Sequence, residues 1–398
     1  MGIGSQYFSA FAAVSGSGTS YTADQVYALL LRSHTESFSF DWLNQERIYQ
    51  GDLTPYVVED SLPQLSYDST QAVPRTLTFR TRGKPAKLNP LTDLVRVHFR
   101  VLAPDGGWLD WTIATLALSQ PRKSIREGWT LYDWTASDLT NWLVTDEFTQ
   151  SYSLQGGTDA IAGAKTVLGS FRGPTLAVLI PGSSRSLSLR DSLSWDRGRS
   201  RLQAIDDVFQ AVSYRPVWPD EWGDLRSEEI PDYNFELPSF TWDATAGNSV
   251  VLSTDAGLQE QPDPANAVNF CAVVGEDPRA HLPIYAEHEN TSPDSPVSTV
   301  ALQRRLVKVV VDSKIADYAS AKIRARAEVQ AGARIFGKFT ILTSAWPAWA
   351  DGGYPLVRLT HSGADEGTQD WTYLVLGWSW TLAPGEVMTH TLQRVVAV

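Results

Sequence analysis

The residues best suited to chemistry are three aromatic rings near the end of the chain. Trp346, Trp349 and Tyr354 lie in a stretch rich in Pro and Gly, which favours a loop that carries its side chains on the surface. Indole and phenol rings on a β scaffold can stack on the faces of sugar rings. The stretch is therefore a candidate for an exposed aromatic loop that binds carbohydrate. The interpretation that we favour is that these rings fill cores or subunit contacts, where aromatic residues are also enriched.

The other reactive residues do not form a catalytic pattern. The six histidines are dispersed, and the nearest pair, His281 and His288, lies in a proline-bounded loop instead of one helical turn apart, as a zinc site would need. The run from Gly182 to Ser186 lacks the second glycine of a nucleophile elbow, and the chain has no Gly-x-x-x-x-Gly-Lys run for phosphate. No catalytic residue, metal site or cofactor is predicted.

Two pairs of neighbouring carboxylates, Asp206 with Asp207 and Glu228 with Glu229, carry little information in a chain with 45 acidic residues. Glycoside hydrolysis needs surroundings that raise the pKa of one carboxyl group, and neither pair has an evident apolar pocket. We interpret both pairs as solvated surface residues. The sequence therefore indicates a protein that is not an enzyme.

Length and charge restrict the class of protein. A chain of 398 residues exceeds one ordinary domain, and 43% hydrophobic residues are enough to bury a core in each of two or three domains. The net charge of −12 argues against a nucleic-acid-binding surface, since affinity for phosphate comes from clustered Lys and Arg. Cys271 is the sole cysteine, which favours folding in a reducing cytoplasm. No apolar run approaches a membrane span, and no secretory signal is expected.

The N-terminal third predicts an antiparallel β domain. Residues 1–20 are small and polar and predict a mobile arm, and the apolar spacing in Tyr21–Arg32 predicts a short helix. Alternating apolar and polar residues then predict four strands, Ser37–Leu43, Arg75–Thr81, Leu94–Leu102 and Trp108–Leu118. Strands with one apolar face favour a barrel or a sandwich.

After these strands, helical signals replace the alternation. Thr135 and Asp138 have the spacing of a capping box, which predicts that a helix starts there. Further helices are predicted from Thr158 and over Ser200–Val212. Next, residues 219–224 form an acidic connection between two short strands of a hairpin. Helices mixed with short strands indicate an α+β module.

The last third predicts a helix resting on β structure. Asp232–Pro264 and Asp277–Pro296 are polar, and predict a domain boundary and a long loop. The strand Leu306–Val311 leads into Asp312, which we expect to cap a helix that ends at Gly332. The buried face of this helix is expected to hold Ile315, Ala319 and Ile323, with Ala316 and Ala327 beside them. Strand signals then resume and continue almost to the last residue.

The order of these elements matches that of a known family. The features that match are the alternating β domain from Phe38, the Thr-Leu-Thr-Phe strand, Asp110–Leu118 followed by Ser119–Pro121, the Leu-Tyr-Asp-Trp-Thr run from Leu131, the Trp218, Asp220 and Gly223 hairpin, Ala265–Val274, and the helix from Asp312. On these features, residues 36–398 resemble the baseplate-hub or tail-tip hub proteins of tailed bacteriophages, here in a minor tail protein of a siphophage. One departure is Gly353–Leu356, where the family usually has a Gly-Asp-x-Val strand start.

The resemblance implies an α+β, mainly β fold, with two tail-tube-like antiparallel β-barrel domains and an α+β module between them. The implied parts are an N-terminal arm and short helix (1–35), the first tube-like β domain (36–125), the α+β module (126–240), a linker with a strand–helix module (241–345), and strands that complete the second tube-like domain (346–398).

The resemblance also implies a structural hub at the virion tail tip or baseplate, synthesised in the cytoplasm of the bacterial host. Three copies would form a homotrimeric ring between the tail tube or distal tail protein and a tail fibre or spike protein, in contact with the tape measure protein. DNA would pass through the ring without specific binding, and no membrane contact is implied. Because the net charge is −12, we hypothesise an acidic lumen along which DNA slides. A carbohydrate-binding or carbohydrate-active β protein is the alternative.

Overall fold

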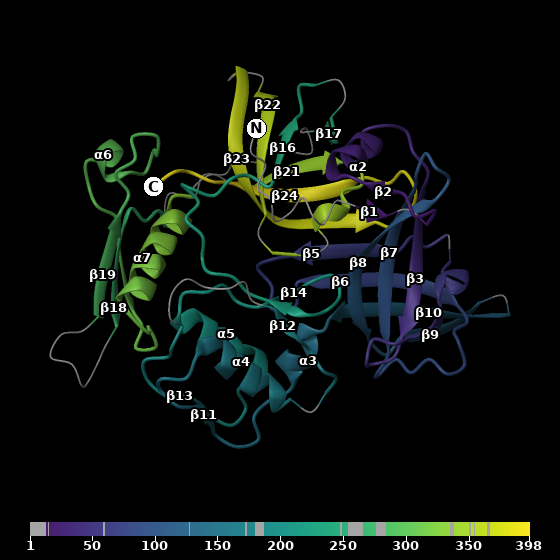
Figure 1. Cartoon of the computed structure of the whole chain (residues 1–398), viewed down its shortest axis with the longest axis horizontal. Coiled ribbons are helices and arrows are strands. Elements are labelled where there is room, and N and C mark those ends of the chain that lie inside the picture. The colour runs from purple at the N-terminus through teal and green to yellow at the C-terminus, as the bar shows by residue number, and fades with distance from the viewer. Residues whose placement is uncertain are drawn as a thin grey trace.

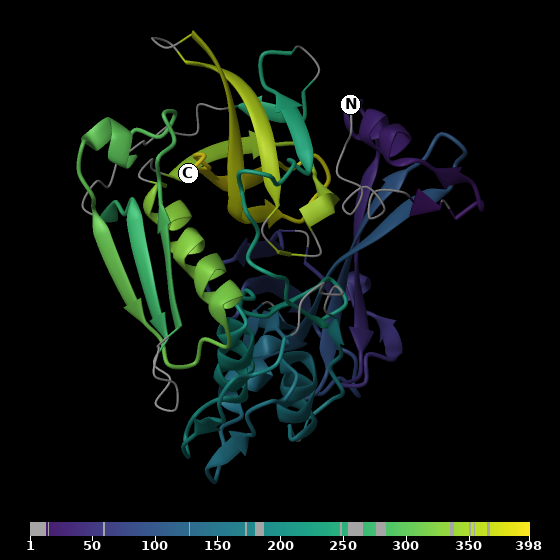
Figure 2. The same cartoon turned by 60° about the vertical axis from the view of Figure 1, so that its left-hand side comes forward.

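The computed structural model describes residues 13–14, 16–58, 60–126, 128–171, 173–179, 187–246, 249–253, 266–275, 284–334, 338–349, 352–353, 355–363 and 367–398. Figure 1 shows a large curved β structure, a mixed helical part below it, and a small sheet covered by one helix at the opposite side of the view. Figure 2 shows the small sheet and its helix as a layered unit of their own. The α+β, mainly β class predicted from the sequence is confirmed.

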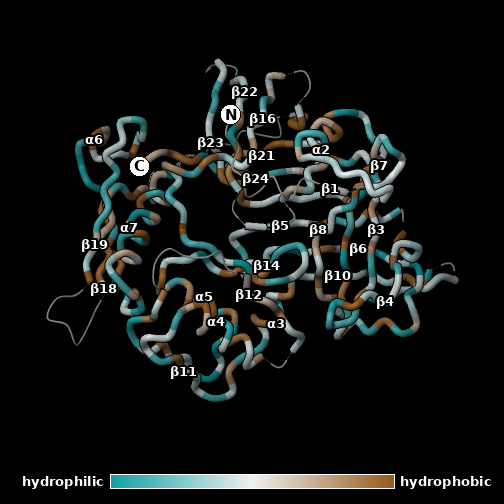
Figure 3. Tube along the Cα trace, in the orientation of Figure 1, coloured by the Kyte–Doolittle hydropathy of each residue, from teal (hydrophilic) through white to brown (hydrophobic). Residues whose placement is uncertain are grey.

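The N-terminal part of the large sheet follows the predicted strands closely. Its strands are β3 (Glu36–Leu43), β4 (Tyr49–Asp52), β5 (Gln64–Asp68), β6 (Arg75–Arg82), β7 (Leu94–Leu102), β8 (Trp108–Leu118), β9 (Arg122–Arg126) and β10 (Trp129–Asp138). In β7, Val95, Val97, Phe99 and Val101 are buried while the residues between them are partly exposed, as their alternation predicts. Figure 3 shows the same change between hydrophobic and hydrophilic residues along these strands.

The C-terminal strands extend the same sheet. They are β16 (Phe240–Asp243), β17 (Val251–Ser253), β21 (Lys338–Thr343), β22 (Leu356–Gly363), β23 (Gly367–Thr381) and β24 (Met388–Arg394). The junction is an antiparallel pairing of β23 with β5, in which Trp378 lies opposite Tyr67 and Trp380 opposite Leu65. Among the described residues, the strands form one open, fourteen-stranded sheet with a single large core, and closed barrels are not found. The two β regions therefore share one sheet.

Two details in this region differ from the prediction. The helix expected after the capping-box spacing of Thr135 and Asp138 is present, but it begins only at Thr140, because β10 continues through Asp138 and pairs with both β6 and β8. Trp134 and Ala136 are buried in that strand, so the pairing of β10 between two neighbours outweighs the local signal. The predicted boundary Asp232–Pro264 contains β16 and β17, whose short alternating segments are hidden by the polar residues around them.

The helical part forms a second core. It contains α3 (Thr140–Thr145), α4 (Ala160–Gly169) and α5 (Arg201–Ala211), with the short strands β11 (Tyr152–Leu154), β12 (Val178–Leu179), β13 (Leu193–Trp195), β14 (Trp218–Pro219) and β15 (Leu225–Arg226). Ser200 caps α5 by accepting a hydrogen bond from the Gln203 backbone N–H at 3.2 Å. Leu202, Ile205 and Phe209 are buried on one face of α5, as predicted.

The small sheet has the order β19-β18-β20, formed by β18 (Phe270–Gly275), β19 (Ile284–Glu289) and β20 (Val307–Val311), with α6 (Thr299–Leu302) beside it. The predicted polar loop Asp277–Pro296 therefore contains a strand, β19. The helix α7 (Tyr318–Gly332) covers one face, and Cys271 is buried beneath it, as expected.

The start and the buried face of α7 differ from the prediction. Its cap is Asp317, whose carboxylate accepts the Ser320 N–H at 2.7 Å, whereas Asp312 stands in the preceding turn and accepts the Lys314 N–H at 2.9 Å. The buried stripe is Ala321, Ala325 and Val329, while Ala319 is exposed. Ile315 and Ala316 are buried before the helix begins. A stripe of alanines still lets the helix lie close to the sheet, so the type of face is confirmed and its register is wrong.

The N-terminal segments complete the large core. β1 (Ala13–Val14) pairs with β2 (Ser20–Tyr21), and α2 (Ala23–Leu30) buries Val26 and Leu30, as predicted for a short docked helix. Most of the predicted arm, residues 1–12, lies outside the described residues. No helix in the described part of the chain is long and apolar enough to cross a membrane. The domain boundaries taken from the resemblance stay predictions.

Ala325→Leu should lower the free energy of unfolding by about 1–3 kcal/mol, because the larger side chain must enter the closed contact between α7 and the small sheet. Ala319→Leu, on the exposed side of the same helix, is the matched control and should change it by less than about 0.5 kcal/mol. Urea unfolding measures both. Equal effects of the two substitutions would contradict the assigned register of α7.

Candidate functional site

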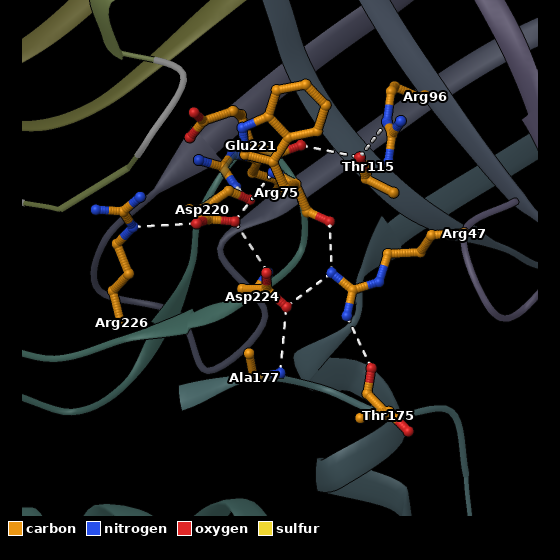
Figure 4. A network of polar contacts seen from close by, with 11 residues as sticks. Arg47, Arg75, Arg96, Thr115, Thr175, Ala177, Asp220, Glu221, Asp224 and Arg226 are labelled. Carbon is orange, nitrogen blue, oxygen red and sulfur yellow. Dashed lines mark hydrogen bonds and ion pairs between the residues drawn. The ribbon is translucent and has the colours of Figure 1, made fainter. Parts of the chain in front are cut away.

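The most densely bonded polar site is the acidic connection between β14 and β15, residues 220–224, which lies against the first β region (Figure 4). Asp220 holds the turn of this connection, and its side chain is almost fully buried. One carboxylate oxygen of Asp220 accepts the N–H groups of Trp222 at 3.0 Å and Asp224 at 2.9 Å, and the other accepts Arg226 Nε at 3.1 Å. Three bonds to one carboxylate fix the shape of the turn.

Arg75 joins this turn to the large sheet. Its side chain is fully buried, and Nη1 donates to the carbonyl oxygens of Pro219 at 2.8 Å and Asp220 at 2.9 Å. The counter-charge is Asp138 on β10, also fully buried, which accepts the Arg75 backbone N–H at 2.6 Å and lies 3.5 Å from Nη1. Burial raises the pKa of Asp138 to about 7, while the Arg75 charge and N–H lower it.

Arg47 makes a second connection. Its guanidinium donates to Asp224 at 2.7 Å, to the Trp222 carbonyl at 3.1 Å and to the Thr175 carbonyl at 2.7 Å (Figure 4). Arg47 has a positive φ of 64°, a backbone geometry that is unusual outside glycine and directs the chain of the β3–β4 turn toward the hairpin. Two arginines from the sheet thus hold one turn of the α+β module.

A third contact comes from the face of β7 and β8. Thr115 donates to the Glu221 carbonyl at 2.9 Å and accepts Arg96 Nε at 3.0 Å, and the Arg96 guanidinium lies over the Trp222 ring at 4.9 Å. Gly223 closes the turn with a φ of +86°, and a Cβ there would stand 2.6 Å from Leu139 Cδ1. The glycine is required both by the backbone conformation and by the lack of space.

This arrangement fixes the α+β module against the sheet. The backbone and two arginines bind the carboxylates of Asp220 and Asp224. The Glu221 carboxylate differs, because its Oε2 is buried with no hydrogen-bond partner among the described residues and burial raises its pKa. Sequence reasoning singled out Trp218, Asp220 and Gly223, but did not find Arg47, Arg75, Thr115 or Asp138. These residues are far apart in the chain, and local patterns carry no signal of their meeting.

The candidate exposed aromatic loop is corrected by the structure. Trp346 is 0% exposed and Trp349 is 1% exposed. Both rings pack edge-on against Phe240 at centroid distances of 5.1 Å, and Trp242 contacts them at 5.4 and 5.8 Å. Tyr354 lies outside the described residues. The two rings fill the large core together with Phe240 and Trp242, which agrees with the interpretation favoured from the sequence.

The carboxylate pairs are also different from their interpretation as solvated residues. Asp206 accepts the Val217 N–H at 2.9 Å, and Asp207 pairs with Lys314 at 2.8 Å and accepts Trp195 Nε1 at 2.9 Å. The pKa of Asp206 is raised to about 7, because burial and the neighbouring Asp207 charge outweigh the lowering effect of the Val217 N–H.

In the second pair, Glu228 forms an ion pair with Arg215 at 3.3 Å. Burial also raises the pKa of Glu228, against the lowering effect of Arg215. The carboxylates of Asp206, Asp207 and Glu228 therefore have structural partners.

Histidine and cysteine residues likewise serve the core. His390 is fully buried, lies 2.7 Å from the Thr343 hydroxyl, and has a pKa lowered to about 3 by burial. Burial raises the pKa of the Cys271 thiol to about 11. His281 and Gly182–Ser186 lie outside the described residues. Within the described ranges, no three His, Cys, Asp or Glu residues are grouped so that they could hold a metal ion.

Two solved structures share this fold over nearly the whole chain. The tail protein from Neisseria meningitidis MC58 matches with a TM-score of 0.60 at 14% identity, over 90% of this chain and 96% of that chain. The 43 kDa tail protein of prophage MuSo2 from Shewanella oneidensis matches with a TM-score of 0.57 at 12% identity, over 90% and 98%. No protein-family model matches the sequence, and the comparison with curated sequences gives no match. The predicted resemblance to phage tail proteins is thus confirmed at the level of the fold.

Arg75→Met should lower the free energy of unfolding by about 3–5 kcal/mol, because it leaves Asp138 buried without its counter-charge and two carbonyl groups without their donor. Arg226→Met, which removes a partly exposed partner of Asp220, is the control and should cost about 1 kcal/mol or less. Adding Asp138→Leu to Arg75→Met should recover part of the loss. Urea unfolding of the four proteins measures this, and a loss for Arg75→Met no larger than that for Arg226→Met would contradict the role given to Arg75.

Asp206→Asn should gain stability relative to the wild type as the pH rises from about 4 to about 7. An acid whose pKa is about 7 when folded and 3.8 when unfolded binds more protons in the folded state, so the wild type loses stability across this window. Between these pH values, the free energy of unfolding of the Asn variant relative to that of the wild type is expected to rise by about 1–4 kcal/mol. Asp206→Glu keeps the carboxyl group and should keep most of the wild-type profile. Parallel profiles for the wild type and the Asn variant would contradict the assignment.

Proposed function

We propose that this protein is a structural hub of a tailed-phage tail tip or baseplate. The observation that carries the proposal is the fold, which the chain shares with two tail proteins over 90% of its length. The connection of residues 220–224 adds a physical reason, because a hub must transmit force between neighbours without bending. Buried charges with several bonds each hold two parts of a chain in one orientation.

A second support is surface that a single copy leaves uncovered. Val307, Val309 and Val311 lie on one face of β20 and are 58%, 59% and 63% exposed. Within the described part of the chain, β20 pairs with β18 alone, so its other side is an open edge. An open edge with exposed β-branched side chains can pair with other chains and cause aggregation, so proteins normally cover it. Such a surface fits a subunit that works inside an assembly.

In the proposed arrangement, three copies form a ring that joins the tail tube and distal tail protein to a fibre or spike protein, next to the tape measure protein. DNA passes through the ring without being bound, along a lumen whose acidic groups repel phosphate. The protein acts without catalysis, is made in the host cytoplasm, and resides in the virion tail. A carbohydrate-binding function has little support, because Trp346 and Trp349 are buried.

The purified protein should sediment at micromolar concentration with three times the mass of the 43.9 kDa chain. Sedimentation equilibrium at several concentrations measures this, and a reconstruction of the ring shows which charges line its bore. A single monomeric species at every concentration would contradict the ring. A trimer whose bore is lined by Lys and Arg would contradict only the acidic lumen.

A further inference from the structure

A basic hairpin projects from one side of the molecule. The strands β9 and β10 form it, and among the described residues β9 pairs with no strand other than β10. Its sequence between residues 122 and 129 contains three basic residues and one acidic residue, in a chain with 33 basic and 45 acidic residues overall. Lys123 and Arg126 are exposed, and neither has an ion-pair partner in the part of the chain that the structure describes.

The same hairpin exposes apolar surface. Ile125 is 70% exposed and Trp129 is 54% exposed, and Arg82 lies over the Trp129 ring at 4.7 Å. Aromatic and arginine side chains at the centre of a contact supply most of the binding energy in protein interfaces. Residues 122–129, referred to below as the basic hairpin, therefore combine positive charge with exposed rings.

A surface of the opposite charge lies on the segment 228–237. This segment contains four acidic residues and no basic residue. It lines a cavity of about 360 Å³ that Arg215, Arg326 and Leu356 complete. Phe235 is 83% exposed and Leu237 is 63% exposed beside the cavity.

Arg215 pairs with Glu228 and Arg326 pairs with Asp232, and the Arg334 guanidinium lies over the Tyr233 ring at 4.9 Å. Residues 228–237, called the acidic surface below, present the exposed carboxylate of Glu236 beside these pairs. Repulsion from Glu236 is one of the causes that raise the pKa of Glu228, after burial. A cation from outside would relieve that repulsion.

The two surfaces lie far apart. In Figure 1, β9 and β10 stand at the right of the view, whereas α7, whose Arg326 pairs with Asp232, lies in the left half. One molecule therefore cannot bring its own hairpin to its own acidic surface. Two different surfaces on different sides of a molecule allow copies to associate head to tail. Such contacts close into a ring when the rotation from one copy to the next divides a full turn.

We propose that the basic hairpin of one copy docks on the acidic surface of a second copy of this chain. The proposal rests on the ring proposed above and assigns the surfaces that close it. Arg126 meets the carboxylates of residues 228–237, and Trp129, which lies opposite Arg126 on the same face of the hairpin, covers Phe235 and Leu237, which removes exposed apolar surface of both copies from water.

The test exchanges one charge across the contact in the full chain. Arg126→Glu and Glu236→Lys are each expected to raise the dissociation constant of the assembly at least about tenfold, because like charges then face each other. The variant that carries both changes restores opposite charges at every contact and should return close to wild-type assembly. Lys165→Glu and Glu386→Lys, at exposed positions outside both surfaces, are the matched controls and should assemble as the wild type does. Thermal unfolding checks that all variants are folded.

Mixing the two single variants distinguishes a ring of three from a simple pair. Arg126→Glu and Glu236→Lys molecules complement each other only when they alternate, and three subunits cannot alternate around a ring. Each mixed trimer therefore keeps one repulsive contact beside two complementary ones, and the mixture should form trimers more readily than either single variant but less readily than the wild type in sedimentation velocity. Trimers as stable as those of the wild type would overturn the head-to-tail contact.

The remaining outcomes separate this proposal from the proposed function. If the wild type is trimeric and the single variants assemble like the controls, the assigned surfaces are wrong while the ring stands. The same holds if the combined variant assembles no better than the single ones. If the wild type is monomeric at every concentration, both the ring and the contact are wrong.

Discussion

The buried guanidinium of Arg75 is the constraint on which the arrangement of the chain depends. It pairs with Asp138 of β10, binds two carbonyl groups at the start of the hairpin turn, and lies 5.5 Å above the ring of Tyr67. Tyr67 in turn donates to the Gly353 carbonyl at 3.0 Å. The first β region, the α+β module and the C-terminal region thus meet at one charge. Because an unpaired charge in the interior is costly, these three parts must keep the same relative position for the charge to stay neutralised.

This constraint explains how a chain with several separate cores keeps its parts in one fixed arrangement. The large core, the core around α5 and the core under α7 are separate sets of side chains. Apolar contacts alone are not directional and would let such units slide, whereas charge-assisted hydrogen bonds fix distances and angles. The surfaces left over, the valine face of β20 and the two charged surfaces, are then presented at fixed positions. Rigid presentation of sites is what a hub needs to align neighbours.

The sequence was sufficient where one strand or helix face decides the structure. The strands β7 and β8 have the predicted ends, and α5 follows its cap Ser200 and its stripe of Leu202, Ile205 and Phe209, because these patterns are local. Prediction failed where pairing with a distant strand decides the secondary structure, as for Thr135 in β10. It also failed where two carboxylates, those of Asp312 and Asp317, could each cap α7. The network of Arg47, Arg75, Thr115 and Asp138 was not found, since residues 47 and 224 carry no mark of their contact. For Trp346 and Trp349 both an exposed loop and a buried position stayed open, because sequence composition does not show what surrounds a ring.

The pairing of β5 with β23 sets the timing of folding during synthesis. Residues 64–68 lie beside residues 377–381, so β5 has no partner on that side until nearly the whole chain has left the ribosome. At translation rates of about 5–20 residues per second, the strand waits for roughly 15–60 seconds with one row of backbone groups unpaired. Nascent chains on one messenger are close neighbours during that interval, and strands with free sides can pair between chains as well as within one. A chaperone that shields β5 during this interval therefore favours recovery of native protein over exchanged dimers.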